Sequence, residues 1–557
     1  MHMIVMSVLL SSGEDLGRGR TRVRGRGAVR GRGGVQRGRG GRAAAAVLPD
    51  PLVEPNMTAP TIPVFTGQPG LKVPVGGTKP TDYYRLYLSD DLVEHFVTET
   101  NRYASQTIVT IGPQKQFTRL KKWREADSPE MKKFIGLVLL TGLVTKPSIE
   151  SYWSTLPILY TPIFSQIMPR NRFQALLRFW HCNDNSHEPA HNSPNRDRLF
   201  KIRPLVTHLQ EKFQLVYTPD KFVAVDESLL LWKGQLVFKQ YIPLKRARFG
   251  IKLFNVCEDT GYTYKFHIYT GKEDPGFQIE DQIPPEAAHL TATEKIVVFM
   301  MNSLLDQGYQ LFMDNWYTGS RLYLYMMRRK TVCCGTMREN RAPMAVRQLV
   351  VSQQEPMKAL RSGPLLFVKW QSSKVVYMLS TMHSEAMQQV TRRGGQKVSK
   401  PSCVVSYNSK MGGVDRADQM LQPYDATRKT TRWYKKVMVH LLQVSLLNSF
   451  LVFKKDQGSS KDFVTFQCDV ISDLLFADSP APAPQLPRTE DVARLTERHF
   501  LSHVPQTGGK RTTTRKCKVC TKSGTRKETA FCCKQCPSHP ALCVIPCFEV
   551  YHTQKKY

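Results

Sequence analysis

An aspartate in the middle of an apolar strand is the feature that most restricts how this chain folds. Asp226 lies within the segment FVAVDESLLLW, between a valine and a run of three leucines. A carboxylate is costly to bury unless a cation or hydrogen-bond donors accompany it, so the fold must supply a partner at this position. Taken alone, Asp226 can also be a paired or edge residue with a purely structural role.

Three further acids occupy comparable positions. Asp314 ends the apolar strand YQLFMDNWY just before a predicted helix, and Asp415 follows two glycines at the start of another helix. Asp418 lies one turn after Asp415 on the same helical face. Asp415 alone can be a helix N-terminal residue favoured by the dipole. Together, carboxylates on separate elements are what two divalent ions about 4 Å apart require for phosphoryl transfer, and Mg²⁺ prefers such oxygen ligands.

The pattern of apolar residues changes along the chain. Residues 82–215 have helical spacing, whereas short strands separated by turns begin at Lys221. Helices are predicted around 296–305 and 320–329, with strands at 309–313 and 331–335. Alternation of this kind predicts an α/β fold, in which a mixed sheet carries helices on its faces. A long basic and apolar helix follows near the end of this region, and the Pro-rich segments 43–80 and 477–487 are predicted to be linkers.

The charge of the chain indicates a polyanionic partner. Lys and Arg total 79 against 46 acidic residues, a formal net charge of +33. DNA or RNA is the simplest such partner, and a basic ribosomal-type scaffold or a membrane-surface protein is the alternative. No apolar run reaches the roughly 18 residues of a spanning helix, so we expect no membrane partner. Residues 17–42 alternate Arg and Gly, which predicts a disordered arm that either holds nucleic acid loosely or is only a solvated tail.

Cysteines gather near the C-terminus, where seven of the 13 fall between Cys517 and Cys547. Two Cys-x₂-Cys pairs are followed by further soft ligands at zinc-binding spacing, and this favours metal over disulfides. The clear ligands are Cys517, Cys520, Cys533, Cys536, Cys543, Cys547 and His552. Two zinc ions need eight ligands, so His539 or Cys532 is expected to supply the eighth, with the pairs interleaved. A module of about 45 residues has too little core to fold without metal.

Two basic clusters are candidate DNA contacts. The first contains Arg428, Lys429, Arg432, Trp433 and Lys435, in which Trp433 either stacks on an unpaired base or belongs to the core. The second surrounds the cysteines and contains Lys516, Lys518, Arg526 and Lys527. Such side chains suit phosphate contacts. The alternative for the second cluster is a protein-binding finger with a solvated basic face.

The motifs VDES, FMDNWYTG and MGGVDRADQM, in this order, carry a resemblance to a known family. With NRYA, KPSIESYW, RFGIK and CFEVYHT, the chain resembles piggyBac-family DDE/D DNA transposases over about residues 82–557. The resemblance implies an RNase H-like catalytic core with an inserted subdomain, a flanking helical domain and a cysteine-rich domain that binds the transposon end. It also implies that Asp226, Asp314 and Asp415 are catalytic and hold two Mg²⁺ or Mn²⁺ ions, with Asp418 close by.

The resemblance and the composition together give the predicted domain boundaries. In chain order they are a disordered arm and linker (1–81), a helical dimerisation and DNA-binding domain (82–219), the catalytic core (220–340), an insertion domain (341–401), the last part of the core (402–423), the second part of the helical domain (424–476), a linker (477–512) and the zinc-binding domain (513–557).

The function implied by the resemblance is cut-and-paste transposition in the nucleus by a homodimer. Such an enzyme binds terminal inverted repeats, excises the element through strand cleavage and hairpin intermediates, and inserts it at TTAA targets. One alternative is a domesticated DNA-binding protein that keeps the fold without catalysis, and another is an RNA-binding protein that uses the Arg/Gly arm. The intact acids favour the transposase, because a protein that only binds DNA has no need for aspartate on a buried strand.

Overall fold

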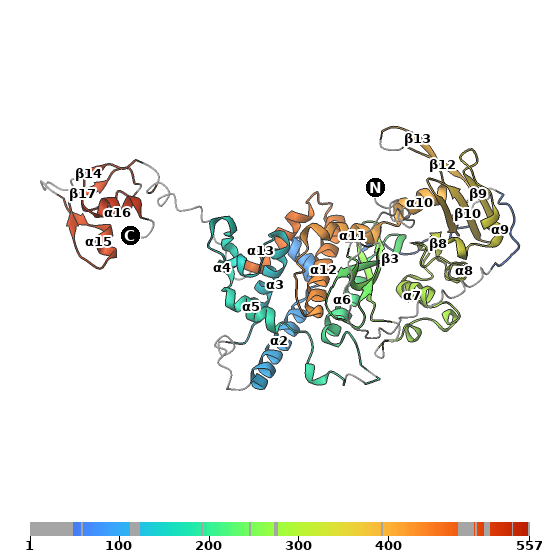
Figure 1. Ribbon diagram of the computed structural model, residues 1–557, viewed down its shortest axis with the longest axis horizontal. Coiled ribbons are helices and arrows are strands. Elements are labelled where there is room, and N and C mark those ends of the chain that lie inside the picture. Colours follow the sequence, from blue (N-terminus) through green and yellow to red (C-terminus); the bar gives the residue numbers. More distant parts are fainter. Residues whose placement is uncertain are drawn as a thin grey trace, which may run out of the picture. The chain divides into compact units, whose positions relative to one another are not determined.

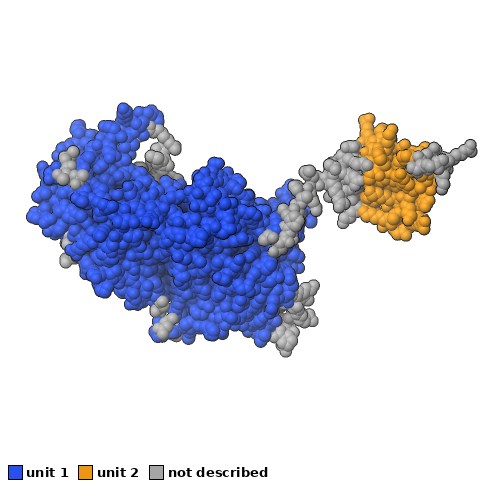
Figure 2. Space-filling model, turned by 180° about the vertical axis from the view of Figure 1, so that it is seen from behind, with its two compact units in different colours: residues 1–478 blue, residues 479–557 orange. Residues whose placement is uncertain are grey.

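The computed structural model describes most of the chain between residues 48 and 557 (Figure 1). The described residues are 48–56, 60–111, 123–190, 193–194, 196–243, 245, 247–271, 274, 277–391, 394–476, 495, 498–505, 513–536, 538–554 and 557. The predicted Arg/Gly arm therefore lies outside the described residues. The chain divides into two compact units, residues 1–478 and residues 479–557 (Figure 2).

The helical part of the first unit comes from two stretches of sequence. Its helices are α1 (Pro80–Arg85), α2 (Asp90–Ile111), α3 (Ser128–Leu143), α4 (Pro162–Ile167), α5 (Arg170–Phe179), α6 (Arg203–Val216), α12 (Trp433–Gln457) and α13 (Phe463–Phe476). Asp127 begins α3 by accepting a hydrogen bond from the backbone N–H of Glu130. Gly458, in the left-handed conformation at φ +58°, follows the end of α12.

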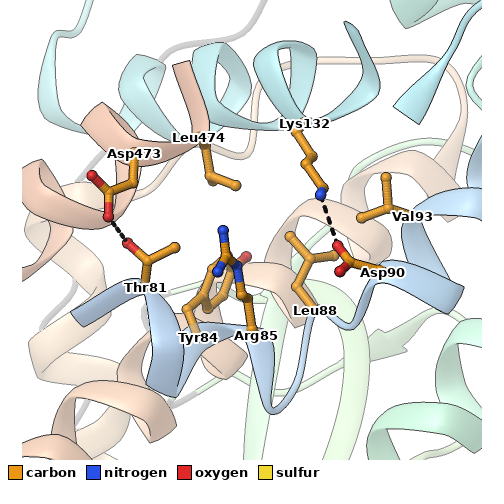
Figure 3. A pocket seen from close by; sticks show the side chains of 9 residues that line it. All are labelled: Thr81, Tyr84, Arg85, Leu88, Asp90, Val93, Lys132, Asp473 and Leu474. Carbon is orange, nitrogen blue, oxygen red and sulfur yellow. Dashed lines mark hydrogen bonds and ion pairs between the residues drawn. The ribbon is translucent and has the colours of Figure 1, made fainter. Parts of the chain in front are cut away.

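The two stretches pack into one helical body. Gly136 of α3 lies against α13, because a Cβ atom at this position would be only 2.9 Å from Cδ2 of Leu475. Figure 3 shows the small pocket where α1, α3 and α13 meet. On one side of it the Thr81 hydroxyl donates to Asp473 Oδ2 at 2.6 Å, and on the other Lys132 pairs with Asp90 at 2.7 Å.

Helix α12 runs through the centre of this body and contacts α1, α6 and α13 (Figure 1). By length and composition it is apolar enough to cross a membrane, with a mean hydropathy of 1.5 over its most apolar window. Most of that window is buried inside the first unit, as expected of a core helix.

A nine-stranded sheet forms the rest of the first unit. Its strands are β3 (Phe222–Leu231), β4 (Gln240–Tyr241), β5 (Phe249–Glu258), β6 (Thr263–Ile268), β7 (Gln310–Met313), β8 (Val332–Met337), β9 (Met357–Ser362), β10 (Leu365–Gln371) and β11 (Val375–Ser380). The order is β4-β5-β3-β7-β8-β11-β10-β9, with β6 also paired to β5. Strand β7 runs parallel to β3 and β8, and the other pairs are antiparallel. The predicted α/β class with a mixed sheet is therefore confirmed.

Helices α7 (Ala292–Met301), α8 (Ser320–Arg328), α9 (Met344–Gln348), α10 (Ser402–Lys410) and α11 (Gly413–Leu421) accompany the sheet. Within the predicted insertion 341–401, β9, β10 and β11 continue the main sheet through the antiparallel pair of β8 and β11. Strands β12 (Met387–Thr391) and β13 (Lys397–Pro401) form a separate ribbon. Residues 236–242 pair with the sheet only at β4, and Phe238 among them packs against Trp433 with ring centroids 5.3 Å apart.

The segment before α1, expected to be a linker, packs along the first unit instead. Val53 forms a β-bridge with Arg361, and β1 (Gly70–Leu71) pairs with β2 (Tyr217–Thr218). Between them the N–H of Thr66 donates to the carbonyl of Gln307 at 2.9 Å. The Pro-rich composition gave an extended conformation, but Leu48, Leu52, Phe65 and Leu71 contact the core and hold the segment there.

The second unit contains short elements. They are β14 (Leu501–His503), β15 (Arg515–Lys516), α15 (Lys518–Lys522), β16 (Glu528–Thr529), β17 (Phe531–Cys533) and α16 (Cys547–Thr553). Strand β14 pairs antiparallel with β17, and β15 with β16. Because β14 lies within the predicted linker 477–512, the folded module starts earlier than the boundary at residue 513.

Candidate functional site

The sheet places Asp226 and Asp314 beside each other. Strands β3 and β7 are parallel neighbours, and Val225 lies opposite Met313 in their register. Asp226 and Asp314 are the next residues on each strand, so both carboxylates emerge where β7 ends. One oxygen of each carboxylate accepts a hydrogen bond from a backbone N–H. The N–H of Glu227 donates to Asp226 Oδ1 and the N–H of Trp316 donates to Asp314 Oδ1, each at 2.8 Å.

Helix α11 brings the other two acids to the same strands. It packs against β3 and β5, and Gly413 at its start touches the end of β5. A Cβ atom at residue 413 would be 2.4 Å from the carbonyl oxygen of Glu258, so a side chain cannot fit without a backbone shift. The second glycine of MGGVD is thus what allows the helix to approach the sheet and carry Asp415 and Asp418 there.

The four aspartates share one electrostatic environment. Burial raises the pKa of Asp226 well above its ordinary value, and Glu227, Asp314 and Asp415 add to the rise. Burial, followed by the charge of Glu227, raises the pKa of Asp314 to about 6. Burial of its carboxyl group also raises the pKa of Asp418 to about 6, with Asp415 adding to it, although the residue as a whole keeps an exposed surface. Raised carboxylate pKa values of this kind are typical of functional sites.

Three more charged residues lie near these four aspartates, which together form the acidic site, and were missed by the sequence analysis. Glu227 accepts a hydrogen bond from the Tyr317 hydroxyl at 3.0 Å, and its Oε2 lies 3.6 Å from the ammonium of Lys252. The ammonium of Lys245 donates to the carbonyl of Glu227 at 2.9 Å and lies 3.9 Å from Asp415 Oδ1. Glu227 and Lys252 fall within the VDES and RFGIK motifs, so the motifs held the signal, but no local spacing reveals the pairing.

The ligand atoms of the acidic site fit divalent cations. The carboxylates of Asp226, Asp314, Asp415 and Asp418 offer hard oxygen ligands and share the ammonium of Lys245. Glu227, the next residue after Asp226 on β3, instead pairs with Lys252. The carboxylate oxygens are not gathered around one point, since none of them belongs to a set of ligand atoms within 4.8 Å of one another. Asp226, Asp314 and Asp415, on three different elements, are the residues that would hold the ions.

The second unit contains two sets of metal-ligand atoms, each within 4.8 Å of one another. One set is Cys517, Cys520, Cys543 and Cys547, and the other is His499, Cys533, Cys536 and His552. Tetrahedral zinc separates two sulfurs by about 3.8 Å, and a sulfur and a nitrogen by about 3.6 Å. The sulfurs of Cys520 and Cys547 are 3.4 Å apart, and Sγ of Cys536 is 3.5 Å from Nε2 of His552. Both sets therefore fit zinc, and they alternate along the chain in the interleaved arrangement.

The eighth ligand is a correction to the sequence analysis. His499, not His539 or Cys532, completes the second set, with Nδ1 at 3.4 Å from Sγ of Cys533. Successive residues of β17 face opposite sides, so Cys532 points away from Cys533 and its sulfur contacts the carbonyl of His503. His539 has its Nδ1 at 3.4 Å from the carbonyl of Cys533 instead of at the sulfur. His499 was missed because it precedes Cys517 within the segment taken for a linker.

The first basic cluster is largely engaged within the protein. Lys435 is 6% exposed, and its ammonium donates to the carbonyls of Leu177 and Arg178. Burial lowers the pKa of Lys435 to about 6. Its assignment as a phosphate contact is therefore wrong, because the side chain closes the end of α5. Lys429 is exposed.

The other members of this cluster also have partners. Arg428 donates to the carbonyl of Lys146 at 2.9 Å, and Arg432 donates to the carbonyl of Arg178 at 3.0 Å. Trp433 is half-buried against Phe238, with ring centroids 5.3 Å apart.

The second basic cluster surrounds an open cleft of about 630 Å³. Among the predicted residues, Lys516 and Lys518 line this cleft, while Arg526 and Lys527 are exposed elsewhere on the unit. The lining is completed by Arg515, Thr521, Lys522, Ser538, His539, Pro540, Ala541 and Tyr557. Lys518 also donates to the hydroxyl of Tyr551 at 3.3 Å. The cleft is thus rich in cations, and none of these lining residues has an acidic side chain.

Comparison with known proteins gives consistent matches to both units. A family model described as Transposase IS4 matches residues 79–450, and one described as a DDE transposase-like zinc finger matches residues 498–553. Human PiggyBac transposable element-derived protein 3 is 24% identical over 491 residues, covering 85% of this chain and 76% of its own. Human PiggyBac transposable element-derived protein 2 is 24% identical over 390 residues, covering 67% and 61%.

A solved structure shares the fold as well. The chain of a piggyBac transposase synaptic complex with hairpin DNA superposes with a TM-score of 0.65 at 23% identity, covering 86% of this chain and 98% of that one. The fold that the resemblance of the motifs predicted is thus shared with a known structure. Because a transposase family model matches most of its length, the chain belongs to the piggyBac transposase family.

Proposed function

We propose that this chain is a metal-dependent cut-and-paste DNA transposase. The observation that carries the proposal is the meeting of Asp226, Asp314 and Asp415 where the middle of β3 lies beside the end of β7 and the start of α11. Burial and mutual repulsion raise carboxylate pKa values there. Carboxylates that only stabilised the fold would be paired one by one with cations. Here four aspartates share the ammonium of Lys245, an arrangement that favours divalent cations and phosphoryl transfer.

The residues in and around the acidic site have separate roles in this proposal. Asp226, Asp314 and Asp415 hold two Mg²⁺ or Mn²⁺ ions, which when bound supply Lewis-acid charge at the scissile phosphate. Asp418, one turn after Asp415 on α11, would add a fourth carboxylate beside the ions. The bond from Tyr317 to Glu227 and the contact of Lys252 with Glu227 fix β3 against the segment after β7, so that Asp226 and Asp314 keep their separation.

DNA recognition is proposed for the second unit. The cation-lined cleft beside Lys516 and Lys518 suits a phosphate backbone, and two structural zinc ions would fix its shape. The solved structure with the shared fold is described as a synaptic complex with hairpin DNA. By analogy we propose binding of transposon ends, hairpin intermediates, insertion at TTAA, and action as a homodimer in the nucleus.

The test is strand cleavage of end DNA by the full chain in Mg²⁺ or Mn²⁺. Asp226→Asn, Asp314→Asn and Asp415→Asn should each abolish cleavage and leave DNA binding unchanged, because the charge is needed only for the ions. Asp259→Asn is the matched control, since Asp259 is not part of the acidic site and pairs with Lys410. Wild-type cleavage by any of the three variants would refute the assignment. DNA binding without cleavage by the wild-type chain would instead indicate a domesticated DNA-binding protein.

A further inference from the structure

Lys245 lies on the loop between β4 and β5, a segment that neither the acidic motifs nor the basic clusters include. Its ammonium is anchored by the hydrogen bond to the carbonyl of Glu227 and lies 3.9 Å from Asp415 Oδ1. The carboxylates of Asp226, Asp415, Glu227 and Asp418 all act on it. One ammonium group from a loop is therefore shared by acids that belong to β3 and to α11.

Other cations near the acidic site have partners outside the four aspartates. Lys252 faces Glu227 from behind and lies over the rings of Trp316 and Phe254, at 4.4 and 4.5 Å from their centroids. Arg338 donates to the side chain of Asn315 at 3.2 Å. Lys245 is the cation that most strongly opposes the rise in the pKa of Asp226, and it also opposes the rise for Asp418.

The charges around the acidic site explain why the position of Lys245 matters. With every group ionised, five carboxylates repel one another across the junction of β3, β7 and α11, and their attraction to Lys245 offsets part of that repulsion. The side chain of Lys245 is 30% exposed, so part of it borders solvent. A loop residue with one backbone anchor can leave the carboxylates more easily than a residue of the sheet can.

We propose that Lys245 is the resident counter-cation of the acidic site. In the metal-free chain its ammonium holds the carboxylates of β3 and α11 together, and a divalent cation must displace that charge in order to bind. Lys245 is thus a positioning residue that keeps the site assembled and lowers its affinity for ions. The inference rests on the proposed function for the identity of the metal ligands.

The first test measures Mn²⁺ binding to the full chain by the signal of free Mn²⁺ in electron paramagnetic resonance. At pH 8, Lys245→Met should bind Mn²⁺ about tenfold more tightly than wild type, because a competing unit charge is gone. Its Tm in EDTA should fall below that of wild type, and Mn²⁺ should close the gap. Lys245→Arg should keep the wild-type affinity. The matched control Lys410→Met should keep it too, because its partner Asp259 is not part of the acidic site.

The second test uses the wild-type chain and does not depend on a variant that folds. Lysine acetylation with an activated ester, read by mass spectrometry, should modify Lys245 slowly in EDTA and several times faster in Mn²⁺, while Lys410 stays constant. An unchanged rate for Lys245, or a Lys245→Met chain that binds Mn²⁺ no more tightly than wild type, would overturn the proposal. Neither measurement uses DNA cleavage, so an inactive chain can still show the competition, and failure of the proposed function is read separately.

Discussion

His499 offers the sharpest test of the structure, because the sequence alone assigned its role to His539 or Cys532. We expect His499→Ala to remove one of the two zinc ions from the full chain. The imidazole Nδ1 lies 3.4 Å from Sγ of Cys533 and 3.7 Å from Sγ of Cys536, the spacing of ligands around one metal. With three ligands left, the second set cannot close a tetrahedron of protein atoms.

The size of the effect follows from how little else holds the module together. Its buried cluster around the second set contains Cys533, Cys536, Leu542 and Tyr551, and β14 adds only three residue pairs to β17. A core this small supplies at most about 3–5 kcal/mol. A structural zinc site contributes about 10–16 kcal/mol, so losing one exceeds what the remaining contacts can offset. The part of the module that contains α16 should therefore unfold.

The assay is zinc content per chain by elemental analysis after exhaustive dialysis, together with affinity for end DNA. Wild type should retain two zinc ions and His499→Ala one, with weaker DNA binding. His539→Ala is the matched control and should retain two, because its ring lies outside both sets. The reasoning would be refuted if His499→Ala kept two ions or if His539→Ala lost one.

Three further outcomes test other parts of the structure. Lys435→Met should leave the salt dependence of DNA binding unchanged because its ammonium is buried, whereas Lys429→Met should lower the slope of log K against log [salt] by about 0.9 if Lys429 contacts a phosphate. Gly413→Ala should cost about 1–3 kcal/mol in urea unfolding and abolish cleavage, since a Cβ atom there meets the carbonyl of Glu258 at 2.4 Å. In EDTA, the Tm should fall as pH rises from 4 to 7, because the folded chain holds the Asp314 proton up to a pKa of about 6 and the unfolded chain releases it earlier; Asp314→Asn should flatten this profile.

The parts of the site that the sequence predicted are those set by local rules. Asp226 and Asp314 were found because a carboxylate in an apolar strand is costly to bury without a cation or hydrogen-bond donors. The parallel register of β3 and β7 then brings them together. The cysteine pairs were found because two ligands at x₂ spacing fit one metal ion. His499 breaks that rule: it reaches its set only through the pairing of β14 with β17, which no spacing in the sequence encodes.

The cations show most clearly why the rest needed the structure. A lysine carries the same charge in the sequence whether it faces DNA, a carboxylate or a helix end, and only tertiary contacts decide among these. Lys429 and Lys435 lie six residues apart in one basic run, yet Lys429 is exposed and Lys435 is buried against the carbonyls of Leu177 and Arg178. Lys245 attracted no notice as an isolated loop lysine, but the fold of β4 and β5 carries it among the acids of β3 and α11. Net charge therefore predicted the kind of partner, whereas the residues that meet that partner depend on which cations the fold has already used.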